Sequence, residues 1–186
     1  MRISIVVPCY NSEGTIEKLV EECRKEFDHK DGYELEMVLV NDFSRDRTYE
    51  AICRAAEKYP FVRGVNLAKN FGQHGALMCA FQYVTGDIVA GIDDDLQNHP
   101  SQIKELLARL GDDCDVVFGK YKKRNFGFFK NLAGAVNGEV EQERGVAAYT
   151  FVIGVHQLRQ TFYMGVLRLM IEPPRAYAGI RFSRHP

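Results

Sequence analysis

Three adjacent aspartates, Asp93, Asp94 and Asp95, follow an apolar run in the segment GIDDDLQNHP at residues 91–100. Carboxylates this close repel one another, and a buried carboxylate is costly unless a cation or hydrogen bonds compensate it. An extended backbone would point Asp93 and Asp95 the same way, and Gln97 repeats the two-residue spacing. Oxygen ligands suit Mg²⁺ or Mn²⁺, which keep coordination positions open for phosphate groups. The segment therefore predicts a divalent metal site. Capping of the next helix is the alternative, and it explains one aspartate but not three.

The elements that must position these carboxylates follow from the apolar pattern. Short runs rich in Val and Ile alternate with amphipathic stretches, which indicates alternating strands and helices. Strands buried on both faces read as continuous apolar runs, so the expected fold class is α/β, with a mostly parallel sheet and helices on both faces. The expected strands are 3–8, 35–40, 61–67, 87–92 and 115–119, and the expected helices are 13–27, 46–58, 73–84 and 100–110.

Polar clusters follow four of the expected strands. Ligands of open α/β sheets bind beyond the carboxyl ends of the strands, so these clusters should share one edge of the sheet. Any one of them could be an ordinary loop, and NDFSRDRT alone fits a capping turn equally well. Together they predict a binding site. The clusters are Pro8, Tyr10 and Asn11; NDFSRDRT at 41–48; AKNFGQHG at 68–75; and the aspartates.

Two common phosphate-binding loops are absent from the sequence. The first expected strand ends in PCYNSEG rather than in G-x-G-x-x-G, and no G-x-x-x-x-G-K-[ST] segment occurs. A nucleotidyltransferase, which also combines an α/β sheet with metal-binding aspartates, usually has a glycine-rich basic loop at this position. Any phosphates must therefore be held mainly by metal and by basic side chains.

Composition narrows the class of protein. The 186 residues suit one domain, or one domain plus an appendage, and the net charge of −1 disfavours a nucleic-acid binder. Five cysteines without a C-x-x-C pair favour a reducing, cytoplasmic setting. We expect no secretory signal, because Pro8 and Asn11 interrupt the first apolar run. No apolar stretch reaches the roughly 20 residues of a membrane span.

Five segments together resemble family 2 glycosyltransferases in order and in spacing. They are IVVPCYNSEGTI, VLVNDFSRDRT, NFGQHGALMCAF, GDIVAGIDDDLQNHP and DVVFGKY. The closest likeness is to the branch of dolichol-phosphate mannosyltransferases and bacterial polyprenyl-phosphate glycosyltransferases, in which DLQ precedes a proline. The resemblance covers residues 2–138. It implies a GT-A fold and an inverting transfer from a nucleotide-diphosphate sugar, with a UDP-sugar as our first expectation. The acceptor would be a polyprenyl phosphate or a glycan in cell-envelope glycan synthesis.

The resemblance also assigns roles to residues of this sequence. Asp93 and Asp95 match the catalytic D-x-D motif that holds the metal on the donor diphosphate, and Gln97 matches a glutamine that completes the metal shell. Asp94 occupies the variable middle position and is expected to face the other way. The base and ribose would be lined by Pro8, Tyr10, Asn11 and Glu13, with Asp42 near the base.

A basic and aromatic run occupies residues 120–130 and contains no acidic residue. This mixture favours contact with phosphate or with an anionic lipid surface, and thus peripheral binding at the cytoplasmic face of the membrane. The alternative is a solvated loop whose aromatic side chains pack on the sheet. Tyr121, Arg124 and Lys130 are candidates for contact with the donor phosphate or the acceptor.

The sequence changes character after residue 138. We therefore expect a GT-A catalytic domain at 1–138 and an atypical tail at 139–186 without a clear strand. Two hypotheses of different class follow: a working sugar transferase, or a truncated module that binds a nucleotide sugar without turning it over. Product formation separates them. Six tail residues fall at helical spacing and would form a stripe that contacts lipid. The equally weighted alternative is that the stripe packs on the sheet or does not fold. The residues are Phe151, Val155, Leu158, Phe162, Val166 and Leu169.

Overall fold

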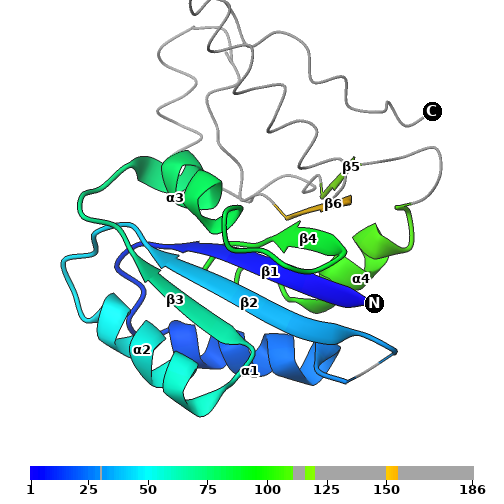
Figure 1. Ribbon diagram of the computed structural model, residues 1–186, viewed down its shortest axis with the longest axis horizontal. Helices are drawn as coiled ribbons and strands as arrows, with labels where there is room; N and C mark the ends of the chain where they lie inside the picture. Colours follow the sequence, from blue (N-terminus) through cyan, green and yellow to red (C-terminus); the bar gives the residue numbers. More distant parts are fainter. Residues whose placement is uncertain (30, 111–115, 120–149, 155–186) are drawn as a thin grey trace, which may run out of the picture.

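The computed structural model of the chain describes residues 1–29, 31–110, 116–119 and 150–154. In this part a single sheet lies between helices on its two faces (Figure 1). The strands are β1 (Arg2–Cys9), β2 (Glu34–Asn41), β3 (Val62–Asn66), β4 (Ile88–Gly91), β5 (Val116–Phe118) and β6 (Phe151–Gly154). The helices are α1 (Ile16–Phe27), α2 (Thr48–Lys58), α3 (Gly72–Ala80) and α4 (Ser101–Leu107). The predicted α/β architecture is confirmed, and each of β1 to β5 and α1 to α4 lies within a few residues of its predicted position.

The described strands form one sheet in the order β3-β2-β1-β4-β6-β5. β1 pairs in parallel with β2 on one side and with β4 on the other, and β2 pairs in parallel with β3. β6 runs antiparallel to both β4 and β5, so β5 points in the same direction as β4. The carboxyl ends of β1, β2, β3 and β4 therefore meet at one edge of the sheet.

Strand β6 corrects two expectations about the tail. The tail was expected to contain no clear strand, yet Phe151–Gly154 pairs between β4 and β5. Phe151 was expected on a helical stripe and is instead the first residue of this strand. A short apolar run such as FVIG reads equally well as helix or strand, which explains the error. The other stripe positions and the predicted boundary at residue 138 lie outside the described residues.

Close approach of Phe151 to β4 requires a glycine. Gly91 is the register partner of Phe151, and a Cβ atom placed on Gly91 would lie 2.1 Å from Phe151 Cε1. The aromatic ring therefore occupies the space where β4 carries no side chain. The absence of a side chain at Gly91 therefore permits β6 to pair with β4 at this position.

The core lies on both faces of β1. Ile5 and its alternate neighbours pack with buried residues of α1, α2 and α4. Val6 faces the opposite side and packs in a second cluster with Ala76 and Ala80 of α3. These small side chains allow α3 to lie close to β1 and β2. Figure 1 shows α1, α2 and α4 on one face of the sheet and α3 on the other.

A buried carboxylate links three segments away from the carboxyl ends of the strands. Glu36 of β2 accepts hydrogen bonds from Ser4 Oγ of β1 (2.5 Å), from the Thr85 amide (2.8 Å) and from Thr85 Oγ1 (2.8 Å). Burial alone would raise the pKa of Glu36, but the hydrogen bonds from Ser4 and Thr85 outweigh burial and lower it. The folded protein therefore stabilises the charged carboxylate of Glu36 relative to the protonated carboxyl group.

Replacement of this carboxylate should destabilise the fold in a pH-dependent way. Because the folded-state pKa of Glu36 is lowered, its stabilisation is present above the unfolded-state pKa of about 4.3 and is lost as the pH falls through the folded-state value. At pH 7 we expect Glu36→Gln to lower the free energy of unfolding by about 1 to 3 kcal/mol. Urea denaturation measures this loss, and the loss should narrow as the pH is lowered below about 4.

The matched control is Glu34→Gln on the same strand, since Glu34 is exposed and forms only a surface ion pair with Arg2. We expect this control to change the free energy of unfolding by less than about 1 kcal/mol. A loss in Glu36→Gln that stays constant from pH 7 to pH 3 would contradict the assignment of a stabilised charge.

Candidate active site

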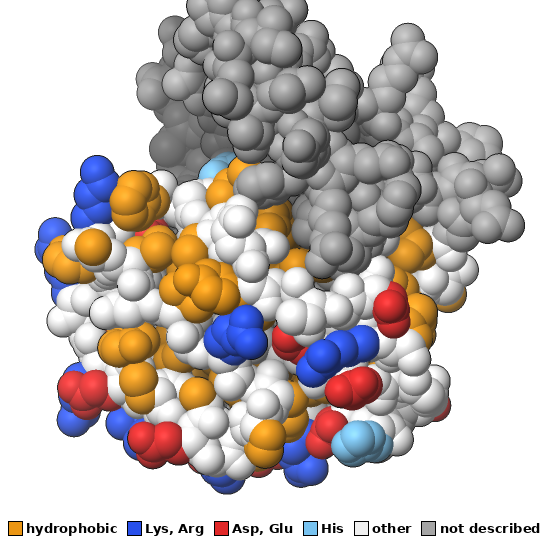
Figure 2. Space-filling view, viewed as in Figure 1, with side chains coloured by type: hydrophobic (Ala, Val, Ile, Leu, Met, Phe, Trp, Pro, Cys, Tyr) orange, Lys and Arg blue, Asp and Glu red, His pale blue; other side chains and the backbone are white. Residues whose placement is uncertain are grey.

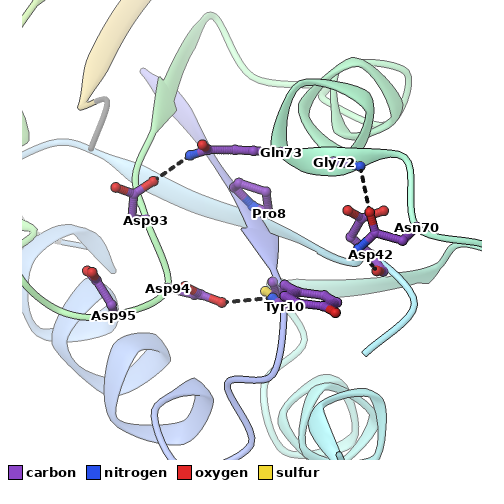
Figure 3. A pocket seen from close by; sticks show the side chains of 10 residues that line it. Pro8, Tyr10, Asp42, Asn70, Gly72, Gln73, Asp93, Asp94 and Asp95 are labelled. Atoms are coloured by element: carbon purple, nitrogen blue, oxygen red, sulfur yellow. Dashed lines mark hydrogen bonds between the residues drawn. The ribbon is translucent and has the colours of Figure 1, made fainter. Parts of the chain in front are cut away.

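A cleft of about 490 Å³ opens at the edge of the sheet where the carboxyl ends of the strands meet (Figure 3). All four polar clusters singled out from the sequence contribute to it. The lining residues come from the end of β1, the residue after β2, the start of α3 and the turn after β4. They are Pro8, Cys9, Tyr10, Asp42, Asn70, Gly72, Gln73, Asp93, Asp94 and Asp95.

The three aspartates lie on a turn rather than on an extended strand. β4 ends at Gly91, and Leu96 has a positive φ of 57°. The strand thus ends before the aspartates, so the extended backbone on which the expected alignment of Asp93 with Asp95 depended is not present, and both residues nevertheless line the cleft. Gln73 Nε2 of α3 donates a hydrogen bond to Asp93 Oδ1 (2.8 Å), and the Gln97 amide donates one to Asp95 Oδ1 (3.0 Å). Each carboxylate is thus oriented by a neutral donor.

Asp94 lies in the cleft beside its two neighbours. Its Oδ2 accepts a hydrogen bond from the Tyr10 amide (3.0 Å), whereas Asp93 points toward Gln73 (Figure 3). The side chains of Asp93 and Asp94 therefore point in different directions, and both line the same cleft. Asp94 joins the loop after β4 to the loop after β1. Burial raises the pKa of the neighbouring Cys9 thiol, and the charge of Asp94 raises it further.

Asp42 is 3% exposed and fixes the start of α3. Its Oδ1 accepts a hydrogen bond from the amide of Phe71, the residue before α3 (2.7 Å). Asn70 Nδ2 donates to the backbone carbonyl of Asp42 (3.1 Å), and the Asp42 amide donates to the carbonyl of Cys9 (2.9 Å). The buried aspartate therefore connects the ends of β1 and β2 to the first turn of α3.

Asn11 and Glu13 hold two loops together and are not among the residues that line the cleft. Asn11 Oδ1 accepts the Arg45 amide (2.9 Å), and the Asn11 amide donates to Ser44 Oγ (3.0 Å). Glu13 Oε2 accepts the Arg47 amide (2.9 Å) and lies 3.5 Å from Arg47 Nε. These contacts join the loop after β1 to the loop after β2, so both residues help to fix the loops that carry cleft residues.

The loops around the cleft contain unusual backbone conformations. Asn11 after β1, Phe43 after β2 and Leu96 after β4 have positive φ angles of 54°, 57° and 57°. Phenylalanine and leucine rarely adopt this left-handed region, because a Cβ atom makes it unfavourable. Strained backbone of this kind gathers at functional sites, where the surrounding structure maintains it. Its occurrence after three neighbouring strands supports a functional role for this edge of the sheet.

The donor set fits a hard divalent cation only if further ligands complete the shell. Asp93 and Asp95 supply carboxylate oxygens, the type of ligand that Mg²⁺ and Mn²⁺ prefer. Among the described residues, no three His, Cys, Asp or Glu side chains gather into a metal-binding group. Gln97 is exposed and lies outside the cleft lining, and its amide orients Asp95. Phosphate or water oxygens would therefore have to complete the coordination.

Three predicted site residues cannot be located in the cleft, and two cleft residues were not predicted. Tyr121, Arg124 and Lys130 lie outside the described residues. Sequence reasoning assigned no role to Asn70 or Gln73, although both belong to the quoted NFGQHG cluster and its flank. Their position after the third strand was the available signal. Their hydrogen bonds to Asp42 and Asp93 depend on how α3 docks, which no local pattern specifies.

A family model described as "Glycosyl transferase family 2" matches residues 4–156. Among curated proteins, the undecaprenyl-phosphate 4-deoxy-4-formamido-L-arabinose transferase of Pectobacterium atrosepticum is 33% identical over 174 residues, which cover 89% of this chain and 51% of the relative. The transferase of the same name from Shewanella sediminis is 39% identical over 116 residues, covering 62% of this chain and 35% of the relative. The chain thus spans about half the length, or less, of these relatives.

Solved structures show the same fold. A mannosyltransferase from Pyrobaculum calidifontis in complex with GDP-Man and Mn²⁺ has a TM-score of 0.53 and 28% identity, covering 66% of this chain and 35% of that one. Glucosyl-3-phosphoglycerate synthase from Mycobacterium tuberculosis, in complex with Mn²⁺, UDP and glucosyl-3-phosphoglycerate, has a TM-score of 0.57 and 21% identity, covering 87% and 65%. The likeness confirms the predicted GT-A architecture.

The cleft contains a thiol that should not act as a nucleophile. Cys9 is fully buried and its pKa is raised, mainly by burial, so little thiolate is present at neutral pH. We expect iodoacetamide at pH 8 to modify Cys9 in the native chain at least about tenfold more slowly than in the chain unfolded in guanidinium. Mass spectrometry of tryptic peptides measures both rates. Cys53, which is partly exposed, is the internal control, and rapid native labelling of Cys9 would refute the expectation.

Proposed function

Because the chain belongs to glycosyl transferase family 2, we propose that it transfers a sugar from a nucleotide-diphosphate donor to a polyprenyl phosphate or glycan acceptor. The observation that carries this proposal is the cleft at the carboxyl ends of the strands, where Asp93 and Asp95 lie across from Asp42 and Tyr10. A cleft with carboxylates on one side and an aromatic side chain on another suits a ligand with a charged diphosphate and a flat base.

Asp93 and Asp95 would hold a Mg²⁺ or Mn²⁺ ion, and the ion would bind the donor diphosphate. When bound, such an ion stabilises the negative charge that develops on the departing nucleotide diphosphate. The chain's contribution is orientation: Gln73 holds Asp93, and the Gln97 amide holds Asp95. Orientation before the ligand arrives lowers the entropic cost of binding it. The solved mannosyltransferase in complex with GDP-Man and Mn²⁺ supports the use of a divalent metal together with a nucleotide sugar.

The nucleoside would lie against Pro8 and Tyr10, with Asp42 at the back of the cleft. Asn11 and Glu13, which we had expected to line the base and ribose, serve this site by clamping the loops that carry Tyr10 and Asp42. We propose that the base is uracil, and the thermal-unfolding experiment below compares UDP with GDP. Contacts of Tyr121, Arg124 and Lys130 with the donor phosphate or the acceptor belong to the same proposal.

Polyprenyl phosphate is the acceptor that fits the chemistry best. A phosphate oxygen is already a nucleophile, so attack on the anomeric carbon needs no strong protein base, whereas a hydroxyl acceptor needs one. Attack from the face opposite the leaving diphosphate inverts the configuration of the sugar. The names of the curated relatives contain undecaprenyl phosphate, which supports this class of acceptor. The reaction would then belong to cell-envelope glycan synthesis.

The acceptor also suggests a location for the protein. A polyprenyl phosphate resides in a membrane, and nucleotide sugars are used on the cytoplasmic side. In the part of the chain that the structure describes, no helix is both long and apolar enough to span a bilayer. We propose that the protein works at the cytoplasmic face of the membrane through peripheral contact.

The second hypothesis is a module that binds nucleotide sugars without transferring them. The chain covers 51% of the Pectobacterium relative. The cleft and its carboxylates would bind the donor in either case. Only product formation distinguishes the transferase from the module.

Loss of one carboxylate should remove the metal dependence of nucleotide binding. We expect Asp95→Asn to abolish the Mn²⁺-dependent stabilisation by UDP, because a neutral amide attracts the cation less strongly than the charged carboxylate does. Thermal unfolding with UDP and GDP, each with and without Mn²⁺, measures the effect. For the wild type, a nucleotide at 100 times its Kd adds roughly 2.7 kcal/mol to the free energy of unfolding.

Asp94→Asn is the matched control, because it removes the same charge while its remaining oxygen can still accept the Tyr10 amide. This control should retain most of the Mn²⁺-dependent shift. Unchanged metal dependence in Asp95→Asn would remove Asp95 from the site, and equal losses in both variants would reduce the effect to general charge.

A further inference from the structure

One long segment of the surface lacks acidic residues. Residues 60–86 contain no Asp or Glu, although the chain has 25 of them in 186 residues. The segment includes β3, α3 and the turn that follows α3. Arg63 and Lys69 supply positive charge in it. The segment therefore carries positive charge that no acidic residue within it offsets.

The same segment exposes large apolar side chains. Phe71 is 55% exposed and Met78 is 49% exposed, and their separation of seven residues is two helical turns, which puts both on one side of α3. Tyr83, just beyond the helix, is 38% exposed. We call Arg63, Lys69, Phe71, Met78 and Tyr83 the α3 face.

The members of the α3 face hold one another in place. Lys69 Nζ lies 4.9 Å from the centroid of the Phe71 ring, and the Arg63 guanidinium lies 5.8 Å from the Tyr83 ring. Arg63 Nη1 also donates a hydrogen bond to the Tyr83 carbonyl (3.2 Å). Gly75 makes room for Phe71, because a Cβ atom there would lie 2.5 Å from Phe71 Cβ. The cations are thus paired with aromatic rings.

The opposite face of the sheet has a different surface. There Lys58 of α2 pairs with Glu17 and Glu21 of α1, and Lys25 pairs with Glu22. Charges of both signs alternate on those helices, as on a surface that faces water. Figure 2 shows orange side chains over the region of α3 and β3 with blue ones beside them, and most red side chains toward the bottom and right of the view.

We propose that the α3 face docks the protein on an anionic lipid surface. Aromatic side chains with an apolar body favour the level of the lipid headgroups, and Lys and Arg beside them attract anionic lipid. Residues 60–86 themselves add no acidic side chain that such a surface would repel. A protein partner would have to be equally acidic and apolar, whereas an anionic bilayer supplies both properties at its surface.

Docking through the α3 face would also bring the cleft close to the lipid surface, because α3 contributes to the lining of the cleft. α3 begins with Gly72 and Gln73, which line the cleft, and Phe71 is bonded to Asp42 through its amide. The helix that would rest on the lipid therefore forms one wall of the proposed donor site. This step rests on the proposed function, because it gives a lipid-linked phosphate a short path to the cleft. Vesicle binding itself does not depend on it.

A single tryptophan can test contact at the α3 face, because the chain contains no tryptophan. The Met78→Trp variant of the full chain should show a blue shift of its emission with phosphatidylglycerol vesicles and none with phosphatidylcholine vesicles. Quenching by brominated lipid should accompany the shift. Tyr49→Trp, on α2 and similarly exposed, is the matched control and should show neither effect. Identical responses of the two variants, or no response in Met78→Trp, would overturn the proposal.

Charge removal supplies an independent test. The double variant Arg63→Gln with Lys69→Gln should lower the partition of the full chain onto phosphatidylglycerol vesicles by about tenfold, and high salt should reduce wild-type partition likewise. The control is Arg54→Gln with Lys25→Gln, which removes two cations from the opposite face and should have little effect. Co-sedimentation measures all four partitions.

Three further results would also overturn the proposal. The first is loss of vesicle binding only when Lys122, Lys123 and Arg124 are changed together to Ala, which would assign binding to that run. The second is a wild-type dimer that Met78→Glu converts to a monomer without any vesicle binding, which would make the α3 face an interface between copies. The third is absence of vesicle binding while the chain still forms product with a detergent-dispersed acceptor. Vesicle binding without any nucleotide binding would instead contradict the proposed function alone.

Discussion

Parallel pairing on both sides of β1 is the constraint on which the rest of the structure depends. β1 is in register with β2 from Arg2 to Cys9 and with β4 from Ile3 to Val6. A central strand of this kind is buried on both faces, so helices must cover both, and its neighbours must point the same way. The polar loops that follow these parallel strands therefore all lie at the same edge of the sheet. The cleft is the direct result.

The crowding of carboxylates at that edge is tolerated because the loops are fastened to one another. Asp94 accepts the amide of Tyr10, Asp93 accepts the side chain of Gln73, and Asp42 accepts the amide of Phe71. Each bond crosses from one strand end or helix start to another, so the carboxylates stabilise the walls of the cleft as well as lining it. α3 takes part in two of these bonds. A displacement of α3 would therefore also move the groups that bond Asp93 and Asp42 in the cleft.

Sequence reasoning succeeded where local pattern decides the outcome. The apolar runs at 3–8 and 35–40 became β1 and β2 because a strand buried on both faces needs them, and the aspartates reached the cleft because a parallel strand delivers them there. It failed where distant segments decide. β6 can pair with β4 because Gly91 leaves space for Phe151, and Gln73 reaches Asp93 only when α3 is docked on β1. The hydrogen bond from the Arg45 amide to Asn11 likewise joins two loops that are distant in the sequence, and the expected contact of Asn11 with a nucleotide stays a prediction.

The central claim is that the carboxylate-lined cleft transfers sugar and does not merely bind its donor. Its most direct test incubates the full chain with undecaprenyl phosphate, Mn²⁺ and a panel of UDP- and GDP-sugars, and detects lipid-linked sugar by mass spectrometry. We expect one donor to give undecaprenyl phosphate linked to a sugar. Formation of this product should require the metal, and Asp95→Asn should abolish product formation. Mn²⁺-dependent nucleotide binding with no product from any donor would contradict transfer and leave the chain as a binding module.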